Sequence, residues 1–408
     1  MPWSTLAQPQ TTPTAADPTI YVGLCQTMPS ATTTGIGSSP LDKLAVELIA
    51  HISFYACTDG GPTGCALSLV SKRIRAASRP ARFFSVSLTT ESSAQLKQFL
   101  ACYQAECARA TDALPRVQHL CISLFGREQG DAPAYPMAHG AVPPVQIQAR
   151  PAAQPAPTSR AEFLARMQRQ TQQWRSAQDR LDEGFSHVVP ALIRAVAPDL
   201  RSLTFVQARW RVTGSVPQCC FAHLRELTLV GGDMTFLPFA LARDGRPQFP
   251  SLRRLHHNLA FAGAGLSFLE WAAHAPNLTH LRVSRLDSHP RVIVDTLDQV
   301  IGDHAAEEYF PHLQHVTIQP NSAPVPSNSN VDAFVEFREF LEYLERLKER
   351  AKAPVVVLPP VEQSIIYPGV DRRLVCLRRL KRQWMERLEG EGPGCWEEGV
   401  EGKPLSHH

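Results

Sequence analysis

The sequence predicts an α/β fold: a small N-terminal helical module, then an irregular repeat solenoid with a parallel β-sheet and helices on its convex side. Three observations predict it. Apolar residues recur at helical spacing between positions 44 and 74, a Leu-x-x-Leu pattern recurs in the second half, and amphipathic helical stretches lie between its copies. With 44% apolar residues in 408, the chain can form a sizeable core.

The helical module is predicted from two short apolar helix faces followed by a strand. Side chains three and four residues apart share one face of a helix. Such faces are formed by Leu44, Leu48, Ile49 and Ile52, and then by Ala66, Leu69, Val70 and Ile74. The segment 83–88 alternates as a strand does. A module this small cannot bury all its apolar surface, so the rest of the chain or a partner must cover it.

Residues 41–88 resemble an F-box. Leu44, Glu47 and Leu48 stand at the opening positions of that family's motif, and residues 70–73 at its closing positions. The loop 57–65 is similar to that of F-box-like proteins of mushroom-forming fungi. Ala45 replaces the usual proline at the helix start, and Ser71 replaces the frequent cysteine. An ordinary helical hairpin that caps a larger domain is the alternative.

The resemblance implies a partner and a function. An F-box docks on a Skp-family adaptor, which bridges to a cullin scaffold, so the chain would be a non-catalytic substrate receptor of a ubiquitin ligase in the cytoplasm or nucleus. The expected adaptor-binding residues, some of which must instead pack the module's core, are Leu44, Val46, Leu48, Ile49, Ile52, Leu69, Val70 and Ile74.

Six copies of the Leu-x-x-Leu pattern predict the repeat domain, and five carry proline two residues before the first anchor. The second anchors are Leu120, Leu203, Leu227, Leu255, Leu281 and Val316. From position 203 to 281 they are 24, 28 and 26 residues apart, and leucine-rich repeats span about 20–29 residues. Because the usual asparagine is mostly missing, the repeat is a degenerate one. A generic α/β domain is the alternative.

The side chains that flank each second anchor are expected to point out of the concave face, because side chains alternate along a strand. A polar protein surface or a short acidic motif would suit them, and plain solvation is the alternative. The expected target-binding residues are Ser202, Thr204, Glu226, Thr228, Arg254, His256, His280, Arg282, His315 and Thr317, with His119 and Cys121 from the early copy.

The remaining segments complete the expected organisation. Residues 1–40 form a disordered tail, 41–88 the F-box-like domain, 89–370 the repeat-like domain with a disordered insertion at 127–158, and 371–408 a basic helix and tail. A helix is expected over 159–196, broken at Gly184 or Pro190. Another is expected over 331–352, then a strand over 355–358. The helix over 371–388 is expected to cap the open end of the solenoid.

Several kinds of chemistry find no support in the sequence. A net charge of +3 does not indicate nucleic acid, and no apolar run predicts a membrane span. Cys219, Cys220 and His223 lack a second ligand pair, so neither a metal nor another cofactor is predicted. No phosphate-binding loop or nucleophile elbow occurs. Two other functions stay open: a leucine-rich-repeat scaffold without adaptor binding, and an enzyme with an unrecognised site.

Overall fold

The computed structural model describes residues 40–90, 93–110, 114–124, 159–207, 219–230, 246–258, 268–286, 290–302, 309–324, 331–360, 372–390 and 396. Residues 1–44 and 45–408 are separate units, and the first contributes the short 3-10 helix η1 (Pro40–Lys43) and Leu44 to this description. Most of the tail expected at 1–40 and all of the insertion expected at 127–158 lie outside the described residues.

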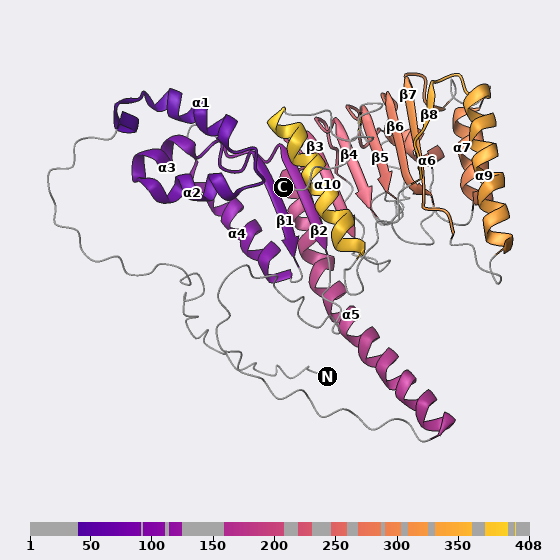
Figure 1. The fold of residues 1–408 in the computed structure, drawn as a ribbon. Helices are drawn as coiled ribbons and strands as arrows, with labels where there is room; N and C mark the ends of the chain where they lie inside the picture. Colours follow the sequence, from indigo (N-terminus) through magenta and orange to yellow (C-terminus); the bar gives the residue numbers. More distant parts are fainter. Residues whose placement is uncertain are drawn as a thin grey trace, which may run out of the picture. The chain divides into compact units, whose positions relative to one another are not determined.

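The second unit is an α/β structure whose described strands form one eight-stranded, all-parallel sheet (Figure 1). Each strand pairs with the next one in the sequence, which confirms the predicted α/β class and the parallel sheet. The strands are β1 (Ser85–Thr90), β2 (His119–Leu124), β3 (Ser202–Gln207), β4 (Glu226–Val230), β5 (Arg254–Asn258), β6 (His280–Leu286), β7 (His315–Pro320) and β8 (Val355–Val357).

The predicted second anchors lie in register across this sheet. Leu203 is flanked by Leu120 of β2 and Leu227 of β4. The row continues through Leu255 and Leu281 to Val316 of β7. All six anchors are buried, so the spacing seen in the sequence is the spacing of one buried row.

A turn before the strands explains the recurring proline. The N–H of the first anchor bonds to the carbonyl three residues earlier, for example Leu252 to Phe249 at 3.1 Å. Proline then stands at the second turn position, where its fixed φ suits the turn. Phe249 is buried and stacks on Phe221, the equivalent residue of the preceding copy, at 5.0 Å between ring centroids. Outside the earliest copy, where Leu114 is exposed, the buried residue before the proline is a further repeat position that the sequence reasoning missed.

The entry to each strand repeats the same hydrogen bonds. The carbonyl of Arg201 accepts from the N–H groups of Arg225 at 2.8 Å and Glu226 at 3.2 Å. Arg225 accepts in the same way from Arg253 and Arg254, both at 3.0 Å. Because successive copies enter the sheet with one geometry, their flanking side chains also form rows.

Helices cover one face of the sheet (Figure 1). They are α4 (Ser93–Arg109), α5 (Arg160–Val196), α6 (Phe268–His274), α7 (Pro290–Ile301) and α9 (Val331–Arg350). Their buried side chains, such as Leu192, Trp271 and Leu344, form one core with the anchor row. The helix expected over 331–352 and the strand expected over 355–358 are therefore α9 and β8.

The break expected in the long helix is wrong. α5 runs without interruption through Gly184 and Pro190. A proline inside a helix removes one backbone hydrogen bond. Here Val189, Leu192 and Ile193 are buried in the core on either side of Pro190, and that packing holds the helix together.

The N-terminal module has three helices rather than the two expected: α1 (Val46–Ala56), α2 (Pro62–Val70) and α3 (Lys72–Ser78). Ser71 separates α2 from α3 because its backbone is extended and its hydroxyl accepts from the N–H of Ile74 at 3.1 Å. This is an N-cap. Leu69 and Ile74 therefore do not share one helix face as the spacing predicted.

The module is fixed to the first edge of the sheet. Ser87 of β1 donates its N–H to the carbonyl of Gly60 at 2.8 Å, and Gly60 donates its own to Ser85 Oγ at 2.9 Å. Gly60 has a φ of 80°, which favours glycine. The loop after α1 thus occupies the hydrogen-bonding edge of β1, which an open sheet would leave unpaired.

Candidate functional site

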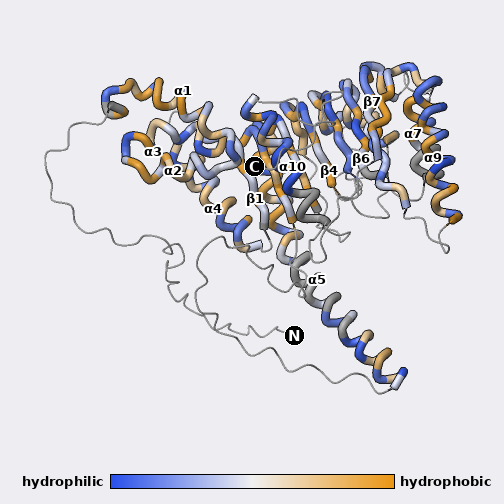
Figure 2. Tube along the Cα trace, viewed as in Figure 1, coloured by the Kyte–Doolittle hydropathy of each residue, from blue (hydrophilic) through white to orange (hydrophobic). Residues whose placement is uncertain are grey.

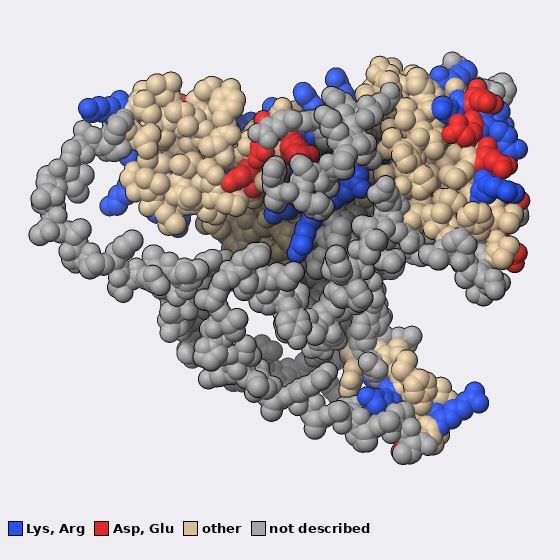
Figure 3. Space-filling view, viewed as in Figure 1, with Lys and Arg blue, Asp and Glu red and all other residues tan. Residues whose placement is uncertain are grey.

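The first candidate surface is apolar and lies on α1 and α2. Within α1 only Ile49 and Ser53 are buried. Val46, Leu48, Ile52 and Tyr55 are exposed on the same helix, which Figure 2 shows as largely hydrophobic. Figure 3 shows mostly uncharged side chains over α1 to α3. Several large exposed apolar side chains on one small module indicate an interaction site.

The structure divides the eight residues expected to bind an adaptor. Ile49 and Ile74 are 6% and 5% exposed and pack the core of the module, and Leu44 is half-buried. The other five are exposed, from 46% for Val46 to 79% for Leu69; they are Val46, Leu48, Ile52, Leu69 and Val70. Tyr55, 73% exposed, was missed, although it lies three residues after Ile52 and so on the same helix face.

The second candidate surface is the sheet face opposite the core helices. The helix α10 (Arg372–Glu389) crosses this face beside β2 and β3 (Figure 1). The expectation that it caps the open end of the repeats is wrong, because its buried side chains Leu380 and Trp384 pack on the side of the sheet that carries Ser202. The last strand, β8, is covered by α9 instead.

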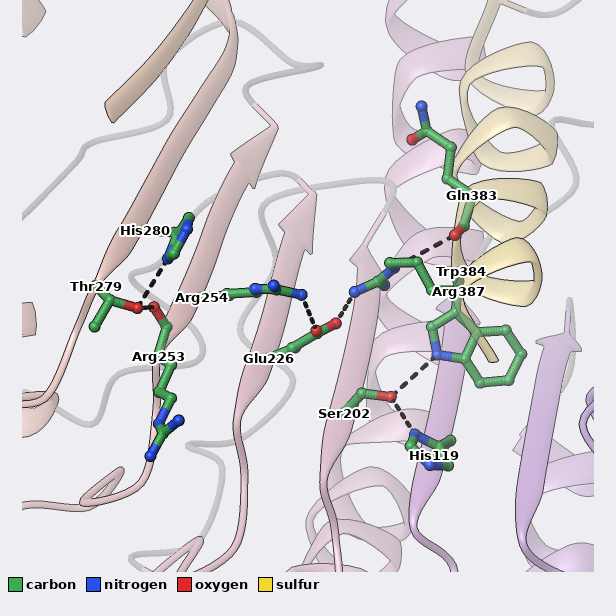
Figure 4. Close-up of polar contacts among 10 residues, drawn as sticks. All are labelled: His119, Ser202, Glu226, Arg253, Arg254, Thr279, His280, Gln383, Trp384 and Arg387. Carbon is green, nitrogen blue, oxygen red and sulfur yellow. Dashed lines mark hydrogen bonds and ion pairs between the residues drawn. The ribbon is translucent and has the colours of Figure 1, made fainter. Parts of the chain in front are cut away.

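Trp384 anchors α10 through a buried polar contact (Figure 4). Its indole N–H donates to Ser202 Oγ at 3.3 Å, and Ser202 Oγ lies 2.8 Å from His119 Nδ1. With the His119 proton on Nε2, the serine O–H donates to Nδ1. Burial, then Arg201 and Arg387, lowers the pKa of His119 from 6.5 to about 4, which keeps the ring neutral at pH 7.

A carboxylate that pairs with two arginines links α10 to the sheet electrostatically (Figure 4). Glu226 of β4 pairs with Arg254 of β5 at 2.9 Å and also with Arg387 of α10. Arg387 joins the helix to the sheet in a half-buried setting, where an ion pair is screened less than at an open surface. Arg387 is therefore a basic residue of α10 that contacts the sheet rather than only solvent.

The exposure expected for the target-binding residues is wrong for five of the ten. Those that flank the anchors of β3 and β4 lie on the part of the face that α10 crosses. The buried ones are Ser202, Thr204, Thr228, His256 and Arg282, and Cys121 of the early copy is also buried. Glu226, Arg254, His280 and Thr317 are half-buried, as is His119, and His315 is exposed.

The buried polar residues of β5 to β7 bond to one another. Ser284 Oγ lies 3.0 Å from His256 Nε2 and 3.1 Å from Arg282 Nε. Arg282 also donates to Gln319 Oε1 at 3.3 Å. Burial, with Arg282 as the next cause, keeps the pKa of His256 well below 6.5. This part of the face is a preformed network rather than a row of solvated side chains.

Trp396 lies over the same part of the face. Its ring centroid is 6.1 Å from that of His256 and 6.4 Å from that of His280. The guanidinium carbon of Arg254 is 5.9 Å from the ring, within the range of a cation–π contact. Trp396 was not predicted, because it stands outside every repeat and every helical stripe.

Neither a metal-binding cluster nor a membrane-spanning helix is found among the described residues. No three His, Cys, Asp or Glu side chains among them lie close enough to hold a metal ion. His223 is exposed, and burial raises the pKa of the Cys219 thiol to about 11. Among the described helices, none is long and apolar enough to cross a bilayer.

Comparison with known proteins adds no family. No family model matches the chain, and no curated protein or solved structure is significantly similar to it. The structure itself defines an α/β protein with an eight-stranded parallel sheet, an apolar surface on its N-terminal helices and a polar sheet face under its C-terminal helix.

Proposed function

We propose that this chain is the substrate-receptor subunit of a Skp–cullin–F-box ubiquitin ligase. In this proposal α1 to α3 are an F-box, and the sheet and core helices are an irregular leucine-rich-repeat domain that binds a target protein. The chemistry of ubiquitin transfer is carried out by other subunits of the ligase. The receptor raises the concentration of the target near them.

The observation that carries the proposal is the exposed apolar surface of α1 and α2. Burying a Val, Leu or Ile side chain is worth about 1.5–3 kcal/mol, so the five exposed ones on α1 and α2 are costly unless a partner covers them. Leu48, Ile52 and Leu69 are among the residues that the F-box resemblance assigns to the adaptor. Their exposure is what an adaptor-binding module needs.

The join between module and sheet supports the same function. Gly60 bonds to β1, and Glu106 of α4 pairs with Arg79 at 3.3 Å and Arg82 at 3.5 Å. Phe54 of α1 packs edge-on against Phe84, next to β1, at 5.8 Å. A receptor must hold its target at a fixed place relative to the adaptor, and these contacts make the join stiff.

The test is complex formation with a purified Skp-family adaptor. Leu48→Asp should abolish binding at micromolar concentrations, because it places a charge in an apolar interface. Leu164→Asp is the matched control, since Leu164 is a helical leucine of α5 that is 53% exposed, against 52% for Leu48. The control should bind as the wild type does. Equal binding by both variants would place the interface elsewhere.

A non-catalytic leucine-rich-repeat scaffold without adaptor binding is the second candidate. Ala45 favours it, because α1 begins without a side-chain cap and without the proline usual in the family. If the wild-type chain forms no complex with the adaptor in the same experiment, this candidate replaces the first.

A further inference from the structure

The first half of α5 projects beyond the sheet and its other covering helices (Figure 1). Every side chain that the structure describes between Arg160 and Glu183 is exposed, and the buried part of the helix begins at Phe185. The projecting half is about 36 Å long, at about 1.5 Å per residue. Helices in proteins owe most of their stability to the packing of an apolar face, so a helix of this length outside the core is suited to pack on another chain.

An apolar stripe runs along this projecting half. Phe163, Leu164 and Met167 are spaced three and four residues apart, so they share one side of the helix. They are 50%, 53% and 47% exposed. In the sequence, Trp174 and Leu181 follow Met167 at intervals of seven residues, the repeat of paired helices. Large apolar side chains exposed in one row indicate a surface that another chain covers.

The charge along the same half changes sign. From position 160 to 175 the sequence has four arginines and one glutamate, and from 176 to 183 it has three acidic residues and one arginine. Because α5 is continuous, the order in the sequence is also the order along the helix. At the two ends of the projecting half, Arg160 and Glu183 are both exposed.

This order of charges makes the helix complementary to a reversed copy of itself. Two copies side by side in parallel would place like charges together. In an antiparallel pair, the basic end of each helix lies beside the acidic end of the other. Charges that flank an apolar seam set the choice of partner and the orientation of paired helices.

We propose that the projecting half of α5 is a self-association site, at which two copies of this chain pair antiparallel to form a two-fold dimer. The apolar stripe is the centre of the contact, and opposite charges flank it. A two-fold contact uses the same surface on both copies, so the assembly closes at two chains. The site goes beyond the proposed function and uses none of the residues of the apolar surface on α1 and α2.

The test is the mass of the full-length chain in solution, measured by sedimentation equilibrium. The wild type should be a dimer at micromolar concentrations. Met167→Asp should raise the dissociation constant about a hundred-fold or more, because a two-fold contact carries the lost apolar side chain and the new charge twice. Gln172→Asp is the matched control. Gln172 is exposed and lies about 140° around the helix from Met167, so this variant should dimerise as the wild type does.

Charge variants test the orientation. Arg160→Glu with Arg166→Glu makes both ends of the projecting half acidic, and Asp182→Lys with Glu183→Lys makes both ends basic. Each double variant alone should dimerise several-fold more weakly than the wild type. An equimolar mixture, with one variant labelled, should recover a mixed dimer, which also shows that both variants are folded. Added salt should weaken the wild-type dimer.

Three results would overturn the proposal. The first is a wild-type chain that stays monomeric at micromolar concentrations. The second is equal dimerisation by Met167→Asp and Gln172→Asp. The third is tighter dimerisation of the variant with Arg160→Glu and Arg166→Glu, because removing the repulsion between two basic ends would strengthen a parallel pair.

Two further variants separate this site from the adaptor surface. Leu48→Asp should dimerise as the wild type does, and loss of its dimer would move the contact to the N-terminal module and overturn the proposal. Leu164→Asp, within the stripe, should be monomeric and should still bind the adaptor. Loss of adaptor binding and loss of the dimer are therefore measured on different variants, so either proposal can fail without the other.

Discussion

Trp384 donates its indole N–H to the hydroxyl of Ser202, which lies 182 positions earlier in the chain, at 3.3 Å. Ser202 flanks the anchor of β3 on the face opposite the core helices. The contact therefore joins the last described helix to one of the first repeat strands, across a face that the repeat pattern alone would leave open.

Removing the Trp384 ring should destabilise the chain strongly. Trp384 is almost fully buried, and replacing a buried Trp by Ala costs about 3–5 kcal/mol. Trp384→Phe should cost less, because it keeps most of the ring and loses only the N–H bond to Ser202. Both are measured as the free energy of unfolding in urea. Arg382→Ala, on an exposed position of the same helix, should change it by at most about 0.5 kcal/mol. An unchanged urea midpoint for Trp384→Ala would refute the packing of α10.

Gly64→Ala should disturb the packing of α2 against the segment that leads from α3 into β1. A Cβ at this position would lie 2.6 Å from the carbonyl oxygen of Arg82, which is backbone and cannot move freely. Overpacking of this kind costs about 1–3 kcal/mol. Thermal unfolding measures the loss, and Ala66→Ser on an exposed position of α2 is the control. If both variants melt together with the wild type, α2 does not pack as described.

Ser71→Ala should destabilise the module by about 1 kcal/mol, because the N–H of Ile74 loses its capping acceptor. Ser71→Asp keeps a capping oxygen and should unfold at the wild-type temperature. Comparing Ser71→Ala with Ser71→Asp distinguishes the loss of the capping hydrogen bond from a loss of solubility. Equal loss in both variants would mean that the cap contributes nothing.

The chain should lose stability in mild acid. The pKa of His119 is lowered from 6.5 to about 4, so the unfolded chain binds a proton between those values that the folded chain does not. The stabilisation that comes from keeping His119 neutral is complete above about pH 6.5. It decreases as the pH falls toward 4. At about pH 5 the loss from His119 is about 2 kcal/mol, at 1.36 kcal/mol per unit. His257, whose pKa burial lowers to about 3, adds to it in the same direction.

Urea unfolding at about pH 7.5 and about pH 5 measures this loss. His119→Asn should show a smaller difference between the two pH values than the wild type. A stability that is the same at both pH values in the wild-type chain would contradict the neutral, buried state of these histidines.

In the N-terminal module, the boundary between α2 and α3 could not be predicted from the sequence. Spacing put Leu69 and Ile74 on one helix face, yet Leu69 is exposed and Ile74 buried. Ser71 ends one helix and begins the next. Serine also occurs on the surface of unbroken helices, so the residue type alone does not place the break. Only the packing of α3 against α1 and α2 decides that the chain turns there.

The sequence by itself determined the parallel sheet and its register. Leu203, Leu227 and Leu255 recur at nearly equal intervals along the chain, and each is an apolar side chain that is stabilised by burial. Stacking the repeats in register buries all three in one row. Only the tertiary structure decided what covers the opposite face. The apolar face of an amphipathic helix such as α10 does not by itself specify the surface on which the helix packs. The position beside Ser202 is determined by contacts that exist only once the sheet has formed.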